Sequence, residues 1–94
     1  MNMVAERILP AYQSALIHAL EDAAGKMPDP KWRRVLLQLS HRTGSEDARE
    51  RLASLERVAI LAESRGWIGP AEAIVLKKLA YRVAVLEERN RRSA

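Results

Sequence analysis

Apolar residues recur along this chain at spacings of three and four, which is the period of an amphipathic α-helix. Short segments containing Gly and Pro separate four such stretches. The pattern predicts helices over about residues 10–25, 30–42, 46–65 and 70–90. Short connections favour antiparallel neighbours, so residues 1–94 are expected to form one all-α domain, a small four-helix bundle of stacked antiparallel helical hairpins.

Local signals place most of the helix boundaries. Asp29-Pro30 and Gly69-Pro70 read as starts, because Pro is preset for the first helical position and Asp accepts hydrogen bonds from the unpaired amides. Gly66 is expected to end the third helix, with Trp67 making the apolar contact that accompanies a glycine cap.

Two further boundaries rest on single residues. Ser45 is expected to cap the third helix. Pro10 interrupts an apolar stripe, and proline inside a helix costs about 3 kcal/mol or more. Either a short N-terminal turn ends near Leu9 and the first long helix begins at Pro10, or the helix is kinked there. We favour the first.

The fourth predicted helix is too apolar to have a single buried face. One stripe comprises Ala71, Val75, Leu76, Leu79, Val83 and Leu86. A second stripe, roughly opposite, comprises Ile74, Tyr81 and Val85. The other three helices each offer one main apolar face, and together they can cover the first stripe. The second stripe and the corner residue Trp67 are therefore predicted to form an interface, most simply with another copy of the chain.

Charge is unevenly distributed along the sequence. The net charge is +4, and residues 31–45 alone contain four cations and no acid. In the second predicted helix, polar or basic residues follow one another on the side opposite its apolar stripe. These are Lys31, Arg34, Gln38, His41 and Arg42. Such a ridge can contact nucleic-acid phosphates, with Gln reaching a base edge, although a solvated basic face would show the same pattern.

Enzymatic and metal chemistry have little support in the sequence. Ser14, His18 and Asp22 are spaced four apart on one helix, but an open helix face supplies neither a pocket nor an oxyanion hole. Two widely separated histidines and no cysteine argue against a metal site. With no glycine-rich phosphate loop, we expect no cofactor and no catalytic residues.

Two functions remain open at this stage. The first is a homo-oligomeric interaction module that binds nucleic acid, or a nucleic-acid-handling complex, through the second helix, as an accessory subunit, regulator or inhibitor. The second is a protein-binding adaptor or antiactivator that uses the second stripe of the fourth helix. A small anionic ligand or an acidic protein surface would fit the same charge. Without a signal peptide or membrane span, we expect a cytoplasmic location and no membrane partner.

Overall fold

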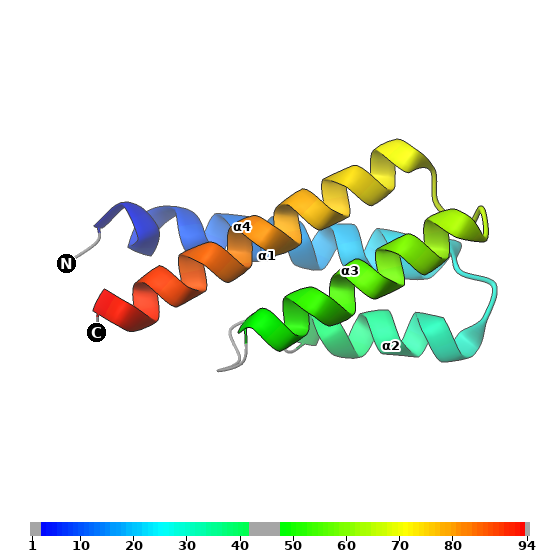
Figure 1. The fold of residues 1–94 in the computed structure, drawn as a ribbon, viewed down its shortest axis with the longest axis horizontal. Helices are drawn as coiled ribbons and strands as arrows, with labels where there is room; N and C mark the ends of the chain where they lie inside the picture. The colour runs from blue at the N-terminus through cyan, green and yellow to red at the C-terminus, as the bar shows by residue number, and fades with distance from the viewer. Residues whose placement is uncertain (1–2, 42–47, 94) are drawn as a thin grey trace.

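The computed structural model describes residues 3–41 and 48–93, which contain four α-helices. The helices are α1 (Met3–Lys26), α2 (Pro30–His41), α3 (Ala48–Ser64) and α4 (Pro70–Ser93). The first two form one antiparallel hairpin, the last two form another, and the hairpins meet mainly where α1 packs on α4 (Figure 1). The predicted bundle of stacked helical hairpins is therefore confirmed.

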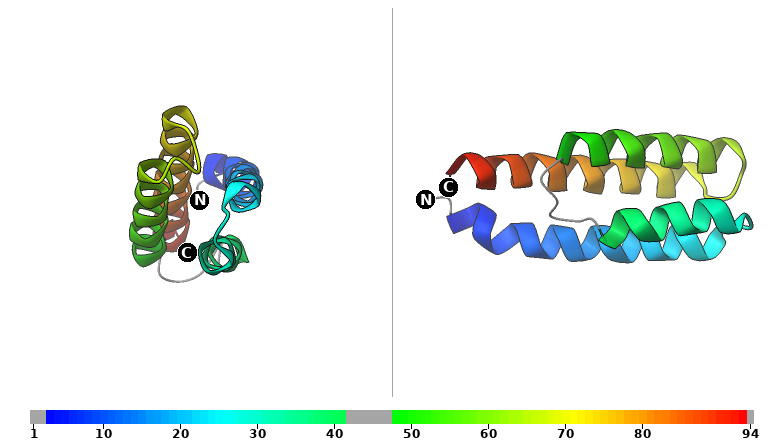
Figure 2. Two further views of the ribbon diagram at one scale, coloured as in Figure 1. Left: turned by 90° about the vertical axis from the view of Figure 1, so that its right-hand side faces the viewer. Right: turned by 90° about the horizontal axis from the view of Figure 1, so that it is seen from below.

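The helices differ in length, so the bundle is thicker at one end. α1 and α4 have 24 residues each, whereas α2 has 12 and α3 has 17. α2 and α3 run beside only part of the longer pair, and α1 and α4 continue together toward the end that carries both termini (Figure 2). The four-helix section therefore lies at the end with the α1–α2 and α3–α4 corners.

The helix starts predicted at Pro30 and Pro70 both form, and each has a local hydrogen bond. At α2, the backbone N–H of Lys31 donates to Oδ1 of Asp29 at 2.9 Å. At α4, the N–H of Gly69 donates to Oε1 of Glu72 at 3.3 Å, so a first-turn carboxylate satisfies an amide at the helix entrance. Because these bonds link neighbours in sequence, they could be predicted without knowing the fold.

The end of α3 also forms as predicted. Gly66 has a φ of 73°, in the left-handed region that favours glycine. The N–H of Gly66 donates to the carbonyl of Glu63 at 3.0 Å, and the N–H of Trp67 donates to that of Ala62 at 2.9 Å. This pair of bonds is the Schellman motif. The predicted cap at Ser45 lies outside the described residues.

The prediction that the first long helix begins at Pro10 is wrong, because α1 runs from Met3 through Pro10 to Lys26. Ile8 packs against the core, and Leu9 is buried within it. These contacts hold the turns before the proline in helical form despite the lost hydrogen bond. Figure 2 shows the first turns, in dark blue, set at an angle to the rest of α1, as a proline in a helix produces.

The buried face of α4 also differs from the prediction. Ala71 and Val75, assigned to the core stripe, are exposed, and Val75 retains 52% of its accessible surface. The buried arc instead includes Ala73 and Ala80 beside Leu76. Because α4 packs between α1 and α3, small residues face the core where the helices approach closely, and larger ones are displaced outward.

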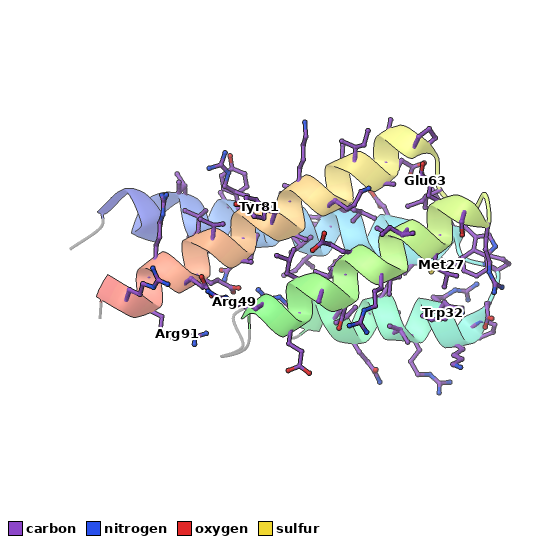
Figure 3. The ribbon with its side chains drawn as sticks, viewed as in Figure 1. Met27, Trp32, Arg49, Glu63, Tyr81 and Arg91 are labelled. Atoms are coloured by element: carbon purple, nitrogen blue, oxygen red, sulfur yellow. The ribbon has the colours of Figure 1, made fainter. Side chains whose placement is uncertain are left out.

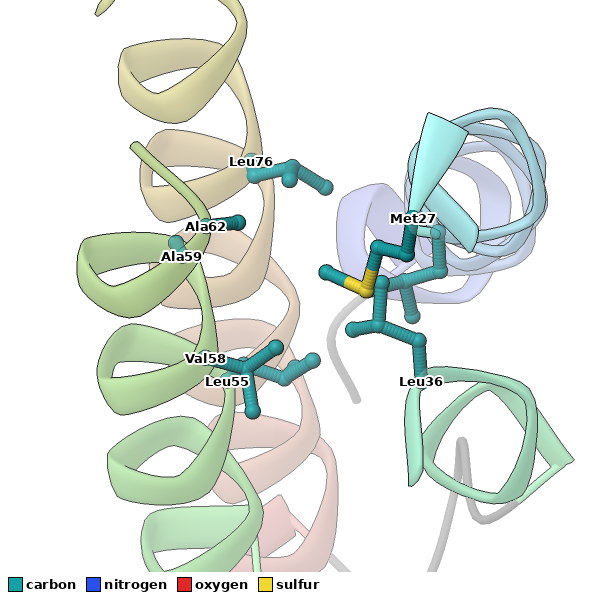
Figure 4. A pocket seen from close by; sticks show the side chains of 8 residues that line it. Met27, Leu36, Leu55, Val58, Ala59, Ala62 and Leu76 are labelled. Atoms are coloured by element: carbon teal, nitrogen blue, oxygen red, sulfur yellow. The ribbon is translucent and has the colours of Figure 1, made fainter. Parts of the chain in front are cut away.

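The centre of the bundle contains one small apolar cavity of about 10 Å³, between the two hairpins (Figure 4). Met27, Leu36, Leu55 and Leu76 are among its lining residues. A space of this size is about one water molecule, and its apolar lining offers a water no partner. We therefore treat the cavity as a packing feature rather than a ligand site.

Candidate interaction surfaces

The outer side of α2 carries three of the five residues predicted to bind an anion. Lys31, Arg34 and Gln38 are exposed along one side of the helix, and Leu36 on the opposite side is 1% exposed. We call these three residues the α2 outer face. His41 is the last residue of α2, but its side chain and the whole of Arg42 lie outside what the structure describes.

The cations of α2 differ in what they do for the fold. Arg33 donates through Nη2 to the carbonyl of Met27 at 2.8 Å, which ties α2 to the end of α1. Nζ of Lys31 lies 5.9 Å from the ring centroid of Trp32. The Arg34 side chain makes no hydrogen bond or ion pair within residues 3–41 and 48–93. Local structure therefore explains Arg33, partly explains Lys31 and gives no role to Arg34.

Two electrostatic effects disfavour these cations where they stand. The first turn of α2 contains no acid, and the positive end of a helix dipole repels cations. Lys31 and Arg34 are three residues apart, so they are neighbours on the helix surface, and like charges at this spacing cost about 0.2–0.5 kcal/mol. By contrast, Arg91 and Arg92 in the last turn of α4 complement its dipole. The fold thus gives no reason for the charge of Arg34 and only part of a reason for that of Lys31.

The four predicted interface residues separate into two groups, three on α4 and one in the corner before it. Ile74 and Tyr81 are exposed, by 49% and 62%, and Val85 on the same side is half-buried. Trp67, in contrast, is half-buried against the core, with the guanidinium of Arg65 5.5 Å from its ring centroid. The stripe is therefore one continuous surface of α4, and Trp67 contributes to the α3–α4 corner instead.

Sequence reasoning missed that cations lie within this exposed stripe. Lys78 and Arg82 are exposed on the same side of α4, beside Val75 and Tyr81. The sequence contained a signal for this basic character, because residues 73–86 contain three cations and no acid. The surface combines apolar and basic character, whereas the prediction considered only its apolar members.

A groove runs beside this stripe, between α4 and α1. It has a volume of about 270 Å³, and its lining includes Ala19 and Ala23 from α1 with Ala71 and Val75 from α4. Asp22 also lines it, from the α1 side. Small side chains on both helices leave this depression open to solvent.

An ion pair between Lys26 and Glu72 lies at the end of the groove nearest the helix corners. The hydrogen bond from Lys26, followed by that from the Gly69 amide, lowers the pKa of Glu72 below its ordinary value. The pair joins the last turn of α1 to the first turn of α4, where each charge also complements its helix dipole.

A second feature missed from the sequence is a buried polar cluster that joins three helices. Nη2 of Arg51 on α3 donates to Oε1 of Glu87 on α4, and their side chains are 1% and 7% exposed. Nε2 of Gln13 on α1 donates to Oε2 of Glu87 at 3.0 Å. The sequence contained a signal for this burial, because Arg51 is three residues after Ala48 and four before Leu55. Helical spacing therefore places Arg51 on the buried side of α3. Its contacts indicate a structural role.

The rejected catalytic pattern lies on an open surface. Ser14, His18 and Asp22 are all exposed on α1, a position that encloses no substrate. Within the described ranges, no three His or carboxylate side chains gather as a metal site would require. None of the described helices has the length and apolar character needed to cross a bilayer.

Comparison of the chain with models of protein families, with curated proteins and with solved structures gave no match. The α2 outer face and the exposed side of α4 are therefore the two candidate functional surfaces of the described residues.

Proposed function

We propose that this chain is a non-enzymatic helical interaction module that binds nucleic acid through the α2 outer face. The observation that carries the proposal is the position of Lys31 and Arg34, which repel each other near the positive end of a helix, while Arg34 makes no hydrogen bond or ion pair with the described residues. Charges held at a cost to local stability are expected where a partner of opposite charge compensates them.

The chemistry of the α2 outer face suits a phosphate backbone. Arg34 presents a planar guanidinium that can bind phosphate through two hydrogen bonds, and Lys31 adds a mobile point charge one turn earlier. Gln38, one turn further along, can donate and accept at a base edge. Since α2 lies along one edge of the bundle, this side of the helix can approach a duplex without the remaining helices intervening (Figure 1).

The exposed side of α4 supports a second candidate function, that of a protein-binding adaptor or antiactivator. Ile74 and Tyr81 expose about half or more of their surface, which is typical of residues that a protein partner covers. The two functions are compatible in one molecule, because the surfaces belong to different helices.

Anisotropy of a short fluorescein-labelled duplex tests the nucleic-acid proposal. Lys31→Ala combined with Arg34→Ala removes two cations from the face, and Lys78→Ala combined with Arg57→Ala removes the same residue types elsewhere. Losing two phosphate contacts should lower the slope of log K against log salt by about 2 and weaken binding about 10- to 60-fold near 0.1 M salt. The control double variant should change the salt slope and the affinity much less.

Equal weakening by the two double variants would show that attraction is set by net charge rather than by α2. No binding of either a duplex or a single strand at low salt would also refute the proposal. Circular dichroism of each variant establishes that its helices remain intact.

A further inference from the structure

The exposed side of α4 is both apolar and basic, a combination that the nucleic-acid proposal does not use. Ile74, Val75 and Tyr81 supply apolar surface, and Lys78 and Arg82 supply charge. We call these five residues the α4 outer face. Figure 3 shows Tyr81 at the upper edge of the molecule and Trp32 of α2 lower down, so this face is separate from the α2 outer face.

The shape of this region favours a helix as the partner. Val75 belongs both to the α4 outer face and to the groove of about 270 Å³ that α4 forms with α1. Ala19, Ala23 and Ala71 give the groove a shallow apolar floor, beside the charged Asp22 and the Lys26–Glu72 ion pair. A trough between two packed helices fits the convex apolar stripe of a third helix, with anchors at positions i, i+3 or i+4, and i+7. A flat bilayer would contact the ridge of α4 but would leave the trough unfilled.

The charge of the α4 outer face argues against a second copy as its occupant. A twofold contact would place the same patch of each chain against the other. Lys78 and Arg82 would then meet their own counterparts. Glu56 of α3 lines the same hollow as these two residues, but Lys77 lies there too, so the cations remain in excess. Like charges brought together at an interface oppose association. A partner with carboxylates beside its apolar stripe meets both requirements.

We propose that the α4 outer face binds an acidic amphipathic helix of a partner protein. The apolar stripe of that helix fills the groove over Val75 and contacts Tyr81, and its carboxylates pair with Lys78 and Arg82. Arg82 is already oriented, because its guanidinium carbon lies 5.9 Å from the ring centroid of Tyr12. Asp22 on the α1 side of the groove repels carboxylates, so the acidic flank of the partner lies toward α4.

A displayed library of helical peptides with randomised outward positions tests this proposal. The full chain is used for selection, and enriched peptides should have net negative charge with apolar residues at helical spacing. An enriched peptide is then synthesised with a fluorophore, and its Kd is measured by anisotropy. Val75→Glu should raise the Kd about tenfold or more, and Lys78→Glu with Arg82→Glu should do the same.

Matched controls come from α3. Ile60 is 56% exposed, a fraction similar to the 52% of Val75. Ile60→Glu therefore introduces a carboxylate at an equally exposed apolar site away from the groove. Arg57→Glu reverses an exposed charge in the same way as Lys78→Glu. Both controls should leave the Kd within about twofold of the unmodified chain, and so should Lys31→Ala with Arg34→Ala. That last variant separates this proposal from the nucleic-acid function, since it should weaken only nucleic-acid binding.

Four results would overturn the proposal. The library could yield no binders, or binders that are neutral or basic. The control substitutions could weaken binding as much as Val75→Glu does. Sedimentation could show a concentration-dependent dimer that Val75→Glu dissociates, which would make a second copy the occupant. Finally, anionic phosphatidylserine vesicles could bind in a Lys78-dependent way while selected peptides do not.

Discussion

Two arginines in this molecule occupy opposite environments. Arg51 on α3 has a side chain 1% exposed and paired with Glu87, whereas Arg34 on α2 is exposed and pairs with nothing in the described residues. A buried cation without a partner would destabilise the fold severely, so Arg51 must be accounted for by structure. Arg34 is exposed to solvent, so the fold does not require a partner for its charge. Charge becomes informative about function only after the cations that the fold needs have been set aside.

The largest expected effect comes from the buried arginine. Arg51→Ala leaves the Glu87 carboxylate buried without its cation, which should cost about 3–5 kcal/mol of stability and lower Tm by more than about 10 °C. Thermal unfolding followed by circular dichroism measures the change. Arg57→Ala, the same substitution at an exposed site on the same helix, should stay within about 0.5 kcal/mol.

A combined variant sharpens this result. Arg51→Met with Glu87→Leu removes both charges and keeps apolar volume in the α3–α4 seam, so it should recover most of the stability lost in Arg51→Ala. If Arg51→Ala proved as mild as Arg57→Ala, the contrast between the two arginines would have no energetic basis.

On α2, removal of a cation is expected to raise the stability of the fold rather than lower it. Arg34→Gln keeps a long polar side chain but removes the repulsion from Lys31 and some of the conflict with the helix dipole. Stability should rise by about 0.3–1 kcal/mol, or roughly 1–8 °C in Tm, while nucleic-acid binding falls. Arg57→Gln is the control, because no charged residue lies three or four positions from Arg57. A lower Tm for Arg34→Gln would mean that the fold uses Arg34 after all.

The features that could be predicted from sequence are those set by neighbouring residues. Asp29, Gly66 and Gly69 mark helix ends through bonds that span only a few residues, and all three behave as predicted. The shared exposed side of Lys31 and Arg34 follows in the same way from helical periodicity alone.

What the sequence could not specify depends on packing between helices. α1 continues through Pro10 because Leu9 is anchored in the core, and Val75 faces solvent because Ala73 and Ala80 take the close contacts. The groove that gives Val75 a functional interpretation exists only once α1 and α4 are side by side. Glu87 is buried because α3 places Arg51 against it, a pairing between two helices.

The smallest expected effect concerns a cation that is exposed and yet used by the fold. Lys26 pairs with Glu72, whose pKa is lowered in the folded state. Because this pKa is lowered by folding, the ionised Glu72 stabilises the protein at pH values above its ordinary pKa of 4.5. That stabilisation is lost as the pH falls through the lowered pKa of the folded state.

Glu72→Gln should therefore reduce stability slightly at neutral pH and not at all in strong acid. Urea midpoints for the two proteins should converge as the pH falls from the ordinary value of 4.5 through the lowered pKa of folded Glu72. A gap that persists in acid would mean that the charge of Glu72 is not what stabilises the fold, because Gln keeps an oxygen that can accept from the Gly69 amide. Lys26 would then join Arg34 among the cations that the fold does not require.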